Sequence, residues 1–350
     1  MNIVQIVPSL KPCGPVNVAL DLTRIFTEKG YTCYVLYFDE HTEKANFNIK
    51  CIHISQYQQI PWQNIEIAHA HGYRPTKFLA KVKQNFSNVK CLLTLHNYIF
   101  DDFRYEYGKI KGYIAALMYI KAIKQVACPI VALSKDAENY YRRIFPKQKI
   151  YYSYNSREIE DLPIEKKDYE IFKSSKDNIT LGIVSVLNKR KNIGSAIKSL
   201  QYLPDKYQLC IIGDGEEFVY LNKLASNLQV KHRVFFLGKK TDAYRYMKYF
   251  DVYLLPSKSE GFPLSLIEAS NAGCAIVSSN LPMITEVFRN NVDIIIADVN
   301  NPSKFAGAIE MALKSKDIKQ NSRSVYDKYF TLEALYERYK KIYNCIIEES

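Results

Sequence analysis

Short apolar runs alternate with segments of helical spacing along the whole chain. Runs of about four to eight mostly apolar residues, bounded by polar residues, Gly or Pro, predict buried strands. In the first part of the chain these runs lie at 2–7, 32–38, 65–72, 90–97 and 129–134. Amphipathic spacing predicts helices at 16–30, 75–84, 109–127 and 135–145. Strands that alternate with helices are typical of a parallel sheet covered on both faces.

A polar, charged stretch at 155–178 interrupts this alternation, and we interpret it as a linker. The alternation then restarts, with strands predicted at 179–186, 208–214, 233–238, 252–257, 274–279 and 293–298. We therefore expect an α/β chain of two doubly wound parallel-sheet domains, 1–160 and 161–325. A last helix at 326–350 is expected to pack back toward the first domain. Ligands of such sheets bind beyond the carboxyl ends of the strands, here in a cleft between two facing domains.

Length and composition fit this interpretation. A chain of 350 residues is long enough for two domains, and a hydrophobic content of 47% supports two cores. No run of about 18 uncharged apolar residues occurs, so no transmembrane helix is expected. The N-terminus lacks the basic region and the long apolar region of a signal peptide. The eight Cys residues include no C-x-x-C pair, and we interpret them as reduced residues of a cytoplasmic protein.

The net charge of +12 is unevenly distributed. Residues 1–155 contain 20 Lys and Arg against 11 Asp and Glu, whereas the remainder contains 28 against 25. An excess of positive charge on one half suggests an anionic partner, such as membrane phosphate, a phosphorylated carrier or nucleic acid. A solvated basic surface explains the charge equally well. Since no recognition motif for nucleic acid is present, we do not expect a nucleic-acid partner.

The segment PSKSEGFPLSLIEASNAG, 256–273, contains the most specific candidate chemistry. It follows a predicted strand, so its first residues form a loop at the carboxyl edge of the sheet. Pro263 is expected as the first residue of a helix that Gly273 closes. The N–H groups of Leu264 and Ser265 then lie unpaired at the start of the helix, where a diphosphate can bind.

Two glutamates flank this helix start. Glu268 lies four residues after Leu264, about 6 Å along the helix at about 1.5 Å per residue, a distance that suits a ribose next to the phosphate. Glu260 precedes the helix, and the hydroxyls of a sugar would satisfy it. In the alternative interpretation, Glu260 is a loop carboxylate stabilised by the helix dipole, and Glu268 is an ordinary surface acid of the helix.

The sequence EGFPLSLIE at 260–268 resembles the E-x7-E signature of retaining GT-B glycosyltransferases of family 4, a family that includes bacterial cell-surface polysaccharide enzymes. The resemblance covers nearly the whole chain. It implies a GT-B fold with an N-terminal acceptor-side domain and a C-terminal domain that binds a nucleotide-sugar, both Rossmann-like. It also implies that Glu268 binds the ribose and that Glu260 contacts the transferred sugar. The amides that hold the sugar and the phosphate would be those of Phe262, Leu264 and Ser265.

A basic turn, LNKRKNI at 187–193, follows the first predicted strand of the second domain. Cations at the carboxyl end of a strand suit a diphosphate. In the family pattern an Arg and a Lys bind the phosphates. Lys191 takes the position of this Lys, but Val186 stands where the Arg is expected, and Arg190 or Lys189 would have to replace it. A solvated basic turn is the alternative.

The resemblance implies contacts for three further residues. Gly14, in the loop at 9–20, allows close approach to the donor phosphate or the acceptor, although a tight turn also explains it. His96 ends a strand at the same edge, and the matching His of the family touches the transferred sugar. A neutral imidazole can donate to a sugar hydroxyl, but a lone His is commonly a packing residue. Lys240 follows the strand whose loop holds the base in the family.

His69 and His71 have the i, i+2 spacing of metal ligands. The sequence shows no third ligand to accompany them, so zinc is not expected. His71 is a candidate for the acceptor side. The turn IIGDGEE at 211–217 does not match a dinucleotide fingerprint. It is interpreted either as a loop near the nucleotide or as a structural turn.

The predicted helix at 109–127 mixes apolar and aromatic residues with four Lys. Such a helix can lie on an anionic membrane face, and many members of the family reach lipid-linked acceptors in this way. A core helix with a basic outer edge explains the pattern equally well. A peripheral location on the inner face of the membrane is therefore one of two expectations for this helix.

These observations lead us to expect a retaining glycosyltransferase. Its donor would be a nucleotide diphosphate-sugar, with UDP as the family's commonest nucleotide, and its acceptor a hydroxyl of a glycan or lipid-linked saccharide. Glu260 and His96 are the expected catalytic residues. No metal and no other cofactor is expected, because no Asp-x-Asp stands in a metal-binding context. The alternatives are a UDP-sugar 2-epimerase of the same fold and a nucleotide-sugar or glycan-binding protein without turnover.

Overall fold

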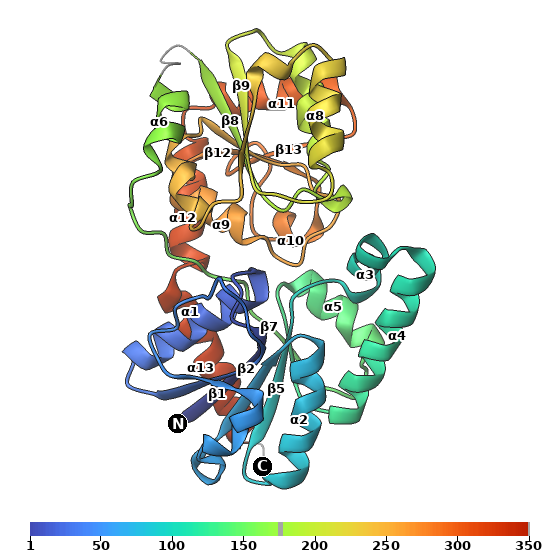
Figure 1. Cartoon of the computed structure of the whole chain (residues 1–350), viewed down its shortest axis with the longest axis vertical. Coiled ribbons are helices and arrows are strands. Elements are labelled where there is room, and N and C mark those ends of the chain that lie inside the picture. Colours follow the sequence, from blue (N-terminus) through green and yellow to red (C-terminus); the bar gives the residue numbers. More distant parts are fainter. Residues whose placement is uncertain (174–177, 349–350) are drawn as a thin grey trace. The chain divides into compact units, whose positions relative to one another are not determined.

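The computed structural model describes residues 1–173 and 178–348 (Figure 1). The chain divides into two compact units. Unit 1 comprises Met1–Ser156 and Tyr329–Ser350, and unit 2 comprises Arg157–Lys328. Each unit has its own parallel sheet and is described by itself below.

The sheet of unit 1 has seven strands in the order β3-β2-β1-β4-β5-β6-β7, all parallel to their neighbours. Its strands are β1 (Asn2–Ser9), β2 (Thr32–Asp39), β3 (Cys51–His53), β4 (Ile67–His71), β5 (Lys90–Leu95), β6 (Ile130–Ala132) and β7 (Ile150–Tyr152). The strand order reverses between the neighbours β1 and β4. Such a switch point opens a crevice at the carboxyl ends of the strands, where ligands bind in doubly wound sheets.

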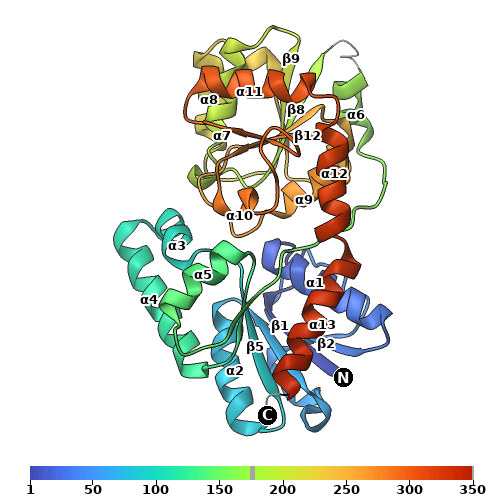
Figure 2. The same ribbon diagram turned by 180° about the vertical axis from the view of Figure 1, so that it is seen from behind.

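Helices cover both faces of this sheet. They are α1 (Gly14–Glu28), α2 (Tyr73–Asn85), α3 (Ile99–Tyr107), α4 (Lys109–Val126), α5 (Lys135–Ile144) and α13 (Leu332–Glu348). Figure 1 shows α2 in front of the strands, and Figure 2, from behind, shows α13 in front of them. The helices α2 and α13 therefore cover opposite faces.

The last helix, α13, belongs to unit 1 although it follows unit 2 in the sequence. Its apolar stripe packs on α1, where the ring of Phe26 lies 5.2 Å from the rings of both Tyr336 and Tyr343. An ion pair between Lys29 and Glu333, with nitrogen and oxygen 2.7 Å apart, lies at the surface of the same contact. Aromatic burial of this kind provides most of the stabilisation, because exposed ion pairs contribute little.

The sheet of unit 2 has six parallel strands in the order β10-β9-β8-β11-β12-β13. They are β8 (Ile179–Val184), β9 (Tyr207–Ile212), β10 (Val234–Gly238), β11 (Val252–Leu255), β12 (Ala275–Ser279) and β13 (Ile295–Ala297). The order reverses between β8 and β11, so the loops after these two strands border the switch point. The core on one face of the sheet centres on the fully buried Leu181, Leu254 and Phe305.

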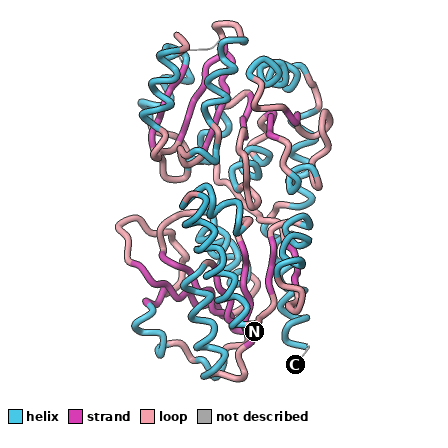
Figure 3. The backbone as a smooth tube through the Cα atoms, turned by 90° about the vertical axis from the view of Figure 1, so that its right-hand side faces the viewer, coloured by secondary structure: helices cyan, strands magenta, loops and turns pink. Residues whose placement is uncertain are grey.

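The helices of this second sheet are α6 (Lys166–Lys173), α7 (Ile193–Ser199), α8 (Phe218–Asn227), α9 (Leu264–Asn271), α10 (Pro282–Thr285), α11 (Pro302–Lys314) and α12 (Ile318–Tyr329). Short 3₁₀ helices lie at Ile54–Gln59, Trp62–Asn64, Lys189–Lys191, Leu200–Tyr202, Lys231–Arg233 and Ala243–Tyr249. Figure 3 shows the strands of each sheet between layers of helix.

The structure confirms that both halves are doubly wound parallel sheets. It adds β3, β7 and α3, which were not predicted, and α6, which lies within the stretch interpreted as a linker. At β3 and β7 the apolar runs are only 51–52 and 150–152, shorter than the four residues that predict a strand. The first segment of unit 1 ends at Ser156, whereas the domain was expected to end at 160, and its second segment begins at Tyr329, whereas the last helix was expected from 326.

Candidate functional site

The loop between β11 and α9 contains the predicted motif. Pro263 is not the first helical residue, as expected, but the N-cap, because its ψ of 121° is extended; α9 begins at Leu264. Gly273 ends the helix as predicted, with φ of +74°. Its N–H donates to Ser270 O at 3.2 Å, and the next N–H, of Cys274, donates to Ala269 O at 3.0 Å. This pair of bonds is a Schellman motif, which needs a left-handed residue that Gly provides without strain.

The first turn of α9 offers backbone donors at the carboxyl edge of the sheet. The first N–H groups of a helix have no intrahelical acceptor, and they carry the positive end of its dipole. Leu264 and Ser265, which provide such groups, are partly exposed. Tyr253 O–H donates to Ser265 Oγ at 2.7 Å and thereby fixes this turn on β11. Phe262, whose backbone was expected to contact the donor, is buried, at 3% exposure of the whole residue.

Glu260 is buried, at 4% exposure, beside two cations. Its Oε1 lies 2.5 Å from Lys191 Nζ, and its Oε2 lies 3.3 Å from Arg190 Nη1. Burial raises the pKa of Glu260, but the opposing charges of Lys191 and Arg190 outweigh it, and the pKa lies below the ordinary carboxyl value. The carboxylate is therefore ionised at neutral pH, and the cluster carries one net positive charge.

This ion cluster joins the loops that follow β8 and β11. Arg190 Nη1 donates to Ser259 O at 2.9 Å, and Lys258 N–H donates to Arg190 O at 2.8 Å. Asn192 Nδ2 donates to Pro256 O at 3.2 Å. Asn192 has a left-handed φ of +52°, which Asn tolerates better than other side chains; it stands where the family pattern has Gly. The two loops that border the switch point are thus fixed to each other.

Val186, which stands where the family pattern has an Arg, is 59% exposed. The guanidinium of Arg190 lies instead at Glu260, beside the ammonium of Lys191. Two cations are therefore present at this edge of the sheet. The sequence named Arg190 and Lys191 as candidates but did not predict that Glu260 would hold both of them.

Glu268 projects from α9 and is buried, at 8% exposure. Its Oε1 lies 3.4 Å from Arg157 Nε, and the Arg157 guanidinium lies 5.8 Å from the centre of the Tyr244 ring. Burial raises the pKa of Glu268, and Arg157 offsets only part of this effect. Sequence reasoning missed Arg157 because this residue falls in the stretch interpreted as a linker, where no pattern distinguishes it.

Lys240 does not join the Glu260 cluster. Its Nζ lies 2.6 Å from an oxygen of Asp168 and 2.9 Å from one of Glu165, and the side chain is 7% exposed. Tyr246 O–H donates to the same Asp168 at 2.6 Å. The ammonium of Lys240 therefore ties the loop after β10 to α6, a structural role that the sequence did not predict.

The glycines of the 211–217 turn are explained by close packing. Gly213 has φ of +138°, and a Cβ there would lie 1.8 Å from Ser185 O. Gly215 has φ of +159°, and a Cβ there would lie 2.4 Å from Leu187 O. Both glycines allow this turn to pack against the backbone of the loop after β8, so the structural interpretation of the turn accounts for them.

In unit 1, Gly14 is the exposed first residue of α1, and a Cβ on it would meet nothing within 4 Å. Its φ lies outside the left-handed region, so the backbone of a tight turn does not explain this glycine. His96 follows the end of β5 directly and is partly exposed. Its Nε2 lies 2.8 Å from Nδ1 of His71, which is fully buried on β4. Among the described residues, no three His, Cys, Asp or Glu side chains are placed to hold a metal ion.

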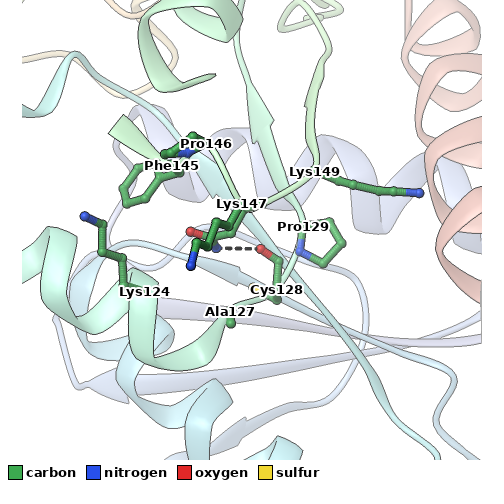
Figure 4. Close-up of a pocket in the computed structure, with 9 residues that line it drawn as sticks. Lys124, Ala127, Cys128, Pro129, Phe145, Pro146, Lys147 and Lys149 are labelled. Atoms are coloured by element: carbon green, nitrogen blue, oxygen red, sulfur yellow. Dashed lines mark hydrogen bonds between the residues drawn. The ribbon is translucent and has the colours of Figure 1, made fainter. Parts of the chain in front are cut away.

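A hollow of about 610 Å³ lies at the opposite edge of the unit 1 sheet, at the amino ends of β6 and β7. Figure 4 shows three of its lining residues, Lys124, Lys147 and Lys149, and the bond from Gln148 Nε2 to Cys128 O, 2.8 Å long. No predicted site residue lines this hollow. Ligand chemistry is therefore better sought at the carboxyl ends of the strands.

Comparison with known proteins identifies similar chains. The model of the family described as glycosyl transferases group 1 matches residues 165–329. An O-antigen biosynthesis glycosyltransferase of Escherichia coli, WclY, is 30% identical over 358 residues, covering 100% of this chain and 99% of the relative. A UDP-Gal:alpha-D-GlcNAc-diphosphoundecaprenol alpha-1,3-galactosyltransferase, also of Escherichia coli, is 24% identical over 311 residues, covering 84% of this chain and 78% of the relative.

Among solved structures, Anabaena HepE in complex with UDP-glucose superimposes with a TM-score of 0.79. It is 16% identical, and the alignment covers 99% of this chain and 100% of HepE. At this identity the likeness concerns the fold. The expected fold class, a GT-B architecture with two doubly wound Rossmann-like sheets, is thereby confirmed.

The ion cluster makes a prediction about stability. Replacing Lys191 in Lys191→Met leaves Glu260 buried with one cation, and we expect a loss of about 3 kcal/mol of unfolding free energy at pH 7. Because the folded-state pKa of Glu260 is lowered, its contribution to stability is present above the ordinary carboxyl pKa and is lost as the pH falls through the folded-state value. The deficit of Lys191→Met should therefore shrink toward pH 3, as measured by thermal unfolding across pH.

The matched control is Lys189→Met, which removes an exposed cation two residues away. This variant should unfold like the unmodified protein at every pH. Equal stability of the two variants at pH 7 would show that Glu260 does not depend on Lys191.

Proposed function

We propose, from the premise that this chain belongs to the group 1 glycosyl transferases, that it is a retaining enzyme of family 4. In this proposal it transfers a sugar from a UDP-sugar to a hydroxyl of a glycan or lipid-linked acceptor during cell-surface polysaccharide synthesis. The names of its relatives support the substrate class: WclY serves O-antigen biosynthesis, and the galactosyltransferase has UDP-Gal as donor.

The observation that carries the proposal is the placement of Lys191 and Arg190 beside Glu260, next to the first turn of α9. A departing nucleoside diphosphate develops negative charge as the bond to the sugar breaks. Fixed cations and helix N–H groups stabilise that charge without having to reorganise. The Glu260 carboxylate holds both cations in place before the donor binds, and in the proposal it also accepts from hydroxyls of the transferred sugar.

The nucleoside end of the donor is assigned to Glu268. A buried carboxylate on the second turn of α9 can accept from both vicinal ribose hydroxyls, at the spacing from the first turn that a ribose next to a phosphate needs. In the free protein this carboxylate faces Arg157 at 3.4 Å. Binding of the ribose would therefore rearrange or share this ion pair.

The transfer step needs no protein nucleophile in this proposal. The acceptor oxygen attacks the anomeric carbon on the face that the diphosphate leaves, the bond to the diphosphate oxygen breaks with its electron pair, and that oxygen takes the acceptor's proton. The configuration at the anomeric carbon is then retained. His96 is proposed to contact the transferred sugar, and the backbone at Gly14 the donor phosphate or the acceptor.

The proposal includes no metal cofactor, because Lys191, Arg190 and the α9 amides provide the positive charge that a diphosphate needs. Two other functions use the same donor site. A UDP-sugar 2-epimerase would change the donor sugar without an acceptor, and a binding protein would hold the nucleotide-sugar unchanged. The exposed Val186, in place of an Arg, is the feature that favours loss of turnover.

The helix α4 supports an additional proposal, that unit 1 docks on an anionic membrane surface on the inner face of the membrane. Large apolar side chains stand exposed along it: Ile110 at 77%, Tyr113 at 57%, Ile114 at 53%, Leu117 at 45% and Met118 at 55%. The helix contains four Lys and no Asp or Glu. None of the described helices is long and apolar enough to cross a bilayer. An apolar face bordered by cations fits the interface of an anionic membrane.

Incubation with UDP-, GDP- and ADP-sugars, with and without acceptor extracts, tests the function. We expect transfer from a UDP-sugar with retained anomeric configuration, read by NMR of the product, and no loss of rate with EDTA. Glu268→Gln should weaken UDP binding roughly 10- to 100-fold, because hydrogen bonds to a charged acceptor are worth about 1.5–3 kcal/mol.

Glu310→Gln, on α11, is the matched carboxylate control and should bind UDP normally. An epimerised donor without acceptor, or binding without any product, would replace the transferase proposal with one of its alternatives. Undiminished UDP affinity in Glu268→Gln would remove Glu268 from the site.

Membrane docking is tested by cosedimentation with vesicles of phosphatidylglycerol and of phosphatidylcholine. The protein should bind the anionic vesicles, and Ile114→Ser should weaken binding roughly tenfold, because burying a side chain of this size is worth about 1.5–3 kcal/mol. Val219→Ser, at the 75% exposed Val219 of α8 in unit 2, should leave binding unchanged. Equal binding by both variants, or none by the unmodified protein, would contradict the proposed surface.

A further inference from the structure

A strip of buried polar side chains crosses the unit 1 sheet beneath α13. Gln5 on β1 is 1% exposed, and His69 and His71 on β4 and Thr94 on β5 are 0% exposed. Gln5 pairs with His69, and His71 with Thr94, across neighbouring strands. Apolar residues would be expected at such positions, because burying polar groups is unfavourable unless they are hydrogen-bonded. The strip therefore calls for an explanation beyond packing.

Hydrogen bonds link this strip from the end of β5 to α13. His96 Nε2 lies 2.8 Å from His71 Nδ1, and His71 Nε2 lies 2.9 Å from Gln5 Oε1. Gln5 Nε2 lies 3.3 Å from the hydroxyl of Tyr343, which lies 2.9 Å from His69 Nδ1. Every side chain between His96 and Tyr343 thus has two partners.

The chain of bonds continues on the other side of His69. His69 Nε2 lies 2.7 Å from Thr94 Oγ1, which lies 3.2 Å from the hydroxyl of Tyr339. Burial lowers the pKa of His69 and His96 to about 3, and that of His71 well below its ordinary value. All three imidazoles are therefore neutral at pH 7, and each has one N–H and one acceptor nitrogen.

The amide of Gln5 decides which nitrogen carries the hydrogen. Its Oε1 can only accept, so His71 must donate from Nε2, which leaves His71 Nδ1 as an acceptor. His96 must then donate from Nε2, and its Nδ1 keeps a lone pair. At the other end Gln5 Nε2 donates to Tyr343, whose O–H is then directed to His69 Nδ1. One amide on β1 thus sets the direction of the bonds from His96 to Thr94, whereas either hydroxyl can donate in the bond between Thr94 and Tyr339.

We propose that Gln5 and His71 are positioning residues that hold His96 with its Nε2–H directed into the sheet and the lone pair of Nδ1 directed away from His71. His96 then accepts a hydrogen bond from a substrate hydroxyl and does not donate one, contrary to the role expected from the sequence. The identification of this hydroxyl as a sugar hydroxyl rests on the proposed function. Within the described part of the chain, His96 makes its hydrogen bond to His71 alone.

Turning the Gln5 amide by 180° would reverse this direction throughout. Gln5 would then donate to His71, His71 would donate to His96, and His96 would present N–H at Nδ1. The two directions have the same donor–acceptor distances, so the state of the His ring nitrogens distinguishes them.

Nitrogen-15 NMR of the histidine rings in the full chain, without ligand, tests the direction. We expect His71 and His96 to carry hydrogen on Nε2 and His69 to do so as well. Hydrogen on Nδ1 of His96 would overturn the proposal. This readout needs no enzymatic activity, so it holds even if no sugar donor is found and the proposed function fails.

The variant Gln5→Met removes the amide at nearly constant volume. We expect the His96 resonances to show a mixture of the two neutral forms. With the sugar donor, we expect kcat to fall about tenfold while UDP affinity stays unchanged, because a misdirected hydrogen bond costs about 1.4 kcal/mol. An unchanged His96 form with unchanged kcat would overturn the positioning role.

The matched control is Gln208→Met on β9 of unit 2. Gln208 is 4% exposed, and its Nε2 donates to Thr180 Oγ1 at 2.8 Å. This variant also removes the amide of a buried strand Gln, but it should change neither the His96 resonances nor kcat. If it lowered kcat as much as Gln5→Met does, loss of stability would explain both effects and the proposal would fail.

Discussion

The buried carboxylate of Glu260 constrains the site of unit 2 more than any other single group. A charge at 4% exposure requires partners, and Lys191 and Arg190 provide them from the loop after β8. Because Glu260 belongs to the loop after β11, the same contacts hold the two switch-point loops together. The first turn of α9 begins four residues after Glu260 and is held in place by those loops. Two cations and the first turn of α9 are thereby fixed near one another, and in the proposed function they form the anion site.

Unit 1 also buries polar side chains, but these side chains are uncharged. Its polar strip is fully hydrogen-bonded from His96 to α13, so burial keeps the imidazoles neutral and the bonds determine their tautomers. A polar group in a sheet interior is tolerated when each donor meets an acceptor. In both units, the side chains that are proposed to contact a ligand are held by buried groups: Lys191 and Arg190 by Glu260, and His96 by His71 and Gln5.

The sequence allowed the fold and the helix that follows the Glu260 loop to be predicted, because these features have a local pattern. Continuous apolar runs located most strands, helical spacing located several helices, and Gly273 marked the end of α9. The partners of Glu260 and of Lys240 were not predicted, because ion pairs between residues about 70 positions apart leave no trace in a local pattern. Arg157 was missed because it lies in the polar stretch at 155–178 that was interpreted as a linker. Gln5 was detectable in principle, as a polar residue within the apolar run at 2–7.

The central claim is that the leaving diphosphate binds at the first turn of α9, beside Lys191. A crystal structure of the protein with UDP tests it most directly. The account predicts diphosphate oxygens within hydrogen-bond reach of the Leu264 and Ser265 amides and of Lys191 Nζ, with the ribose at Glu268. The account would be contradicted if the diphosphate density lay elsewhere, with no ligand at the Glu260 cluster and with Glu268 still paired with Arg157.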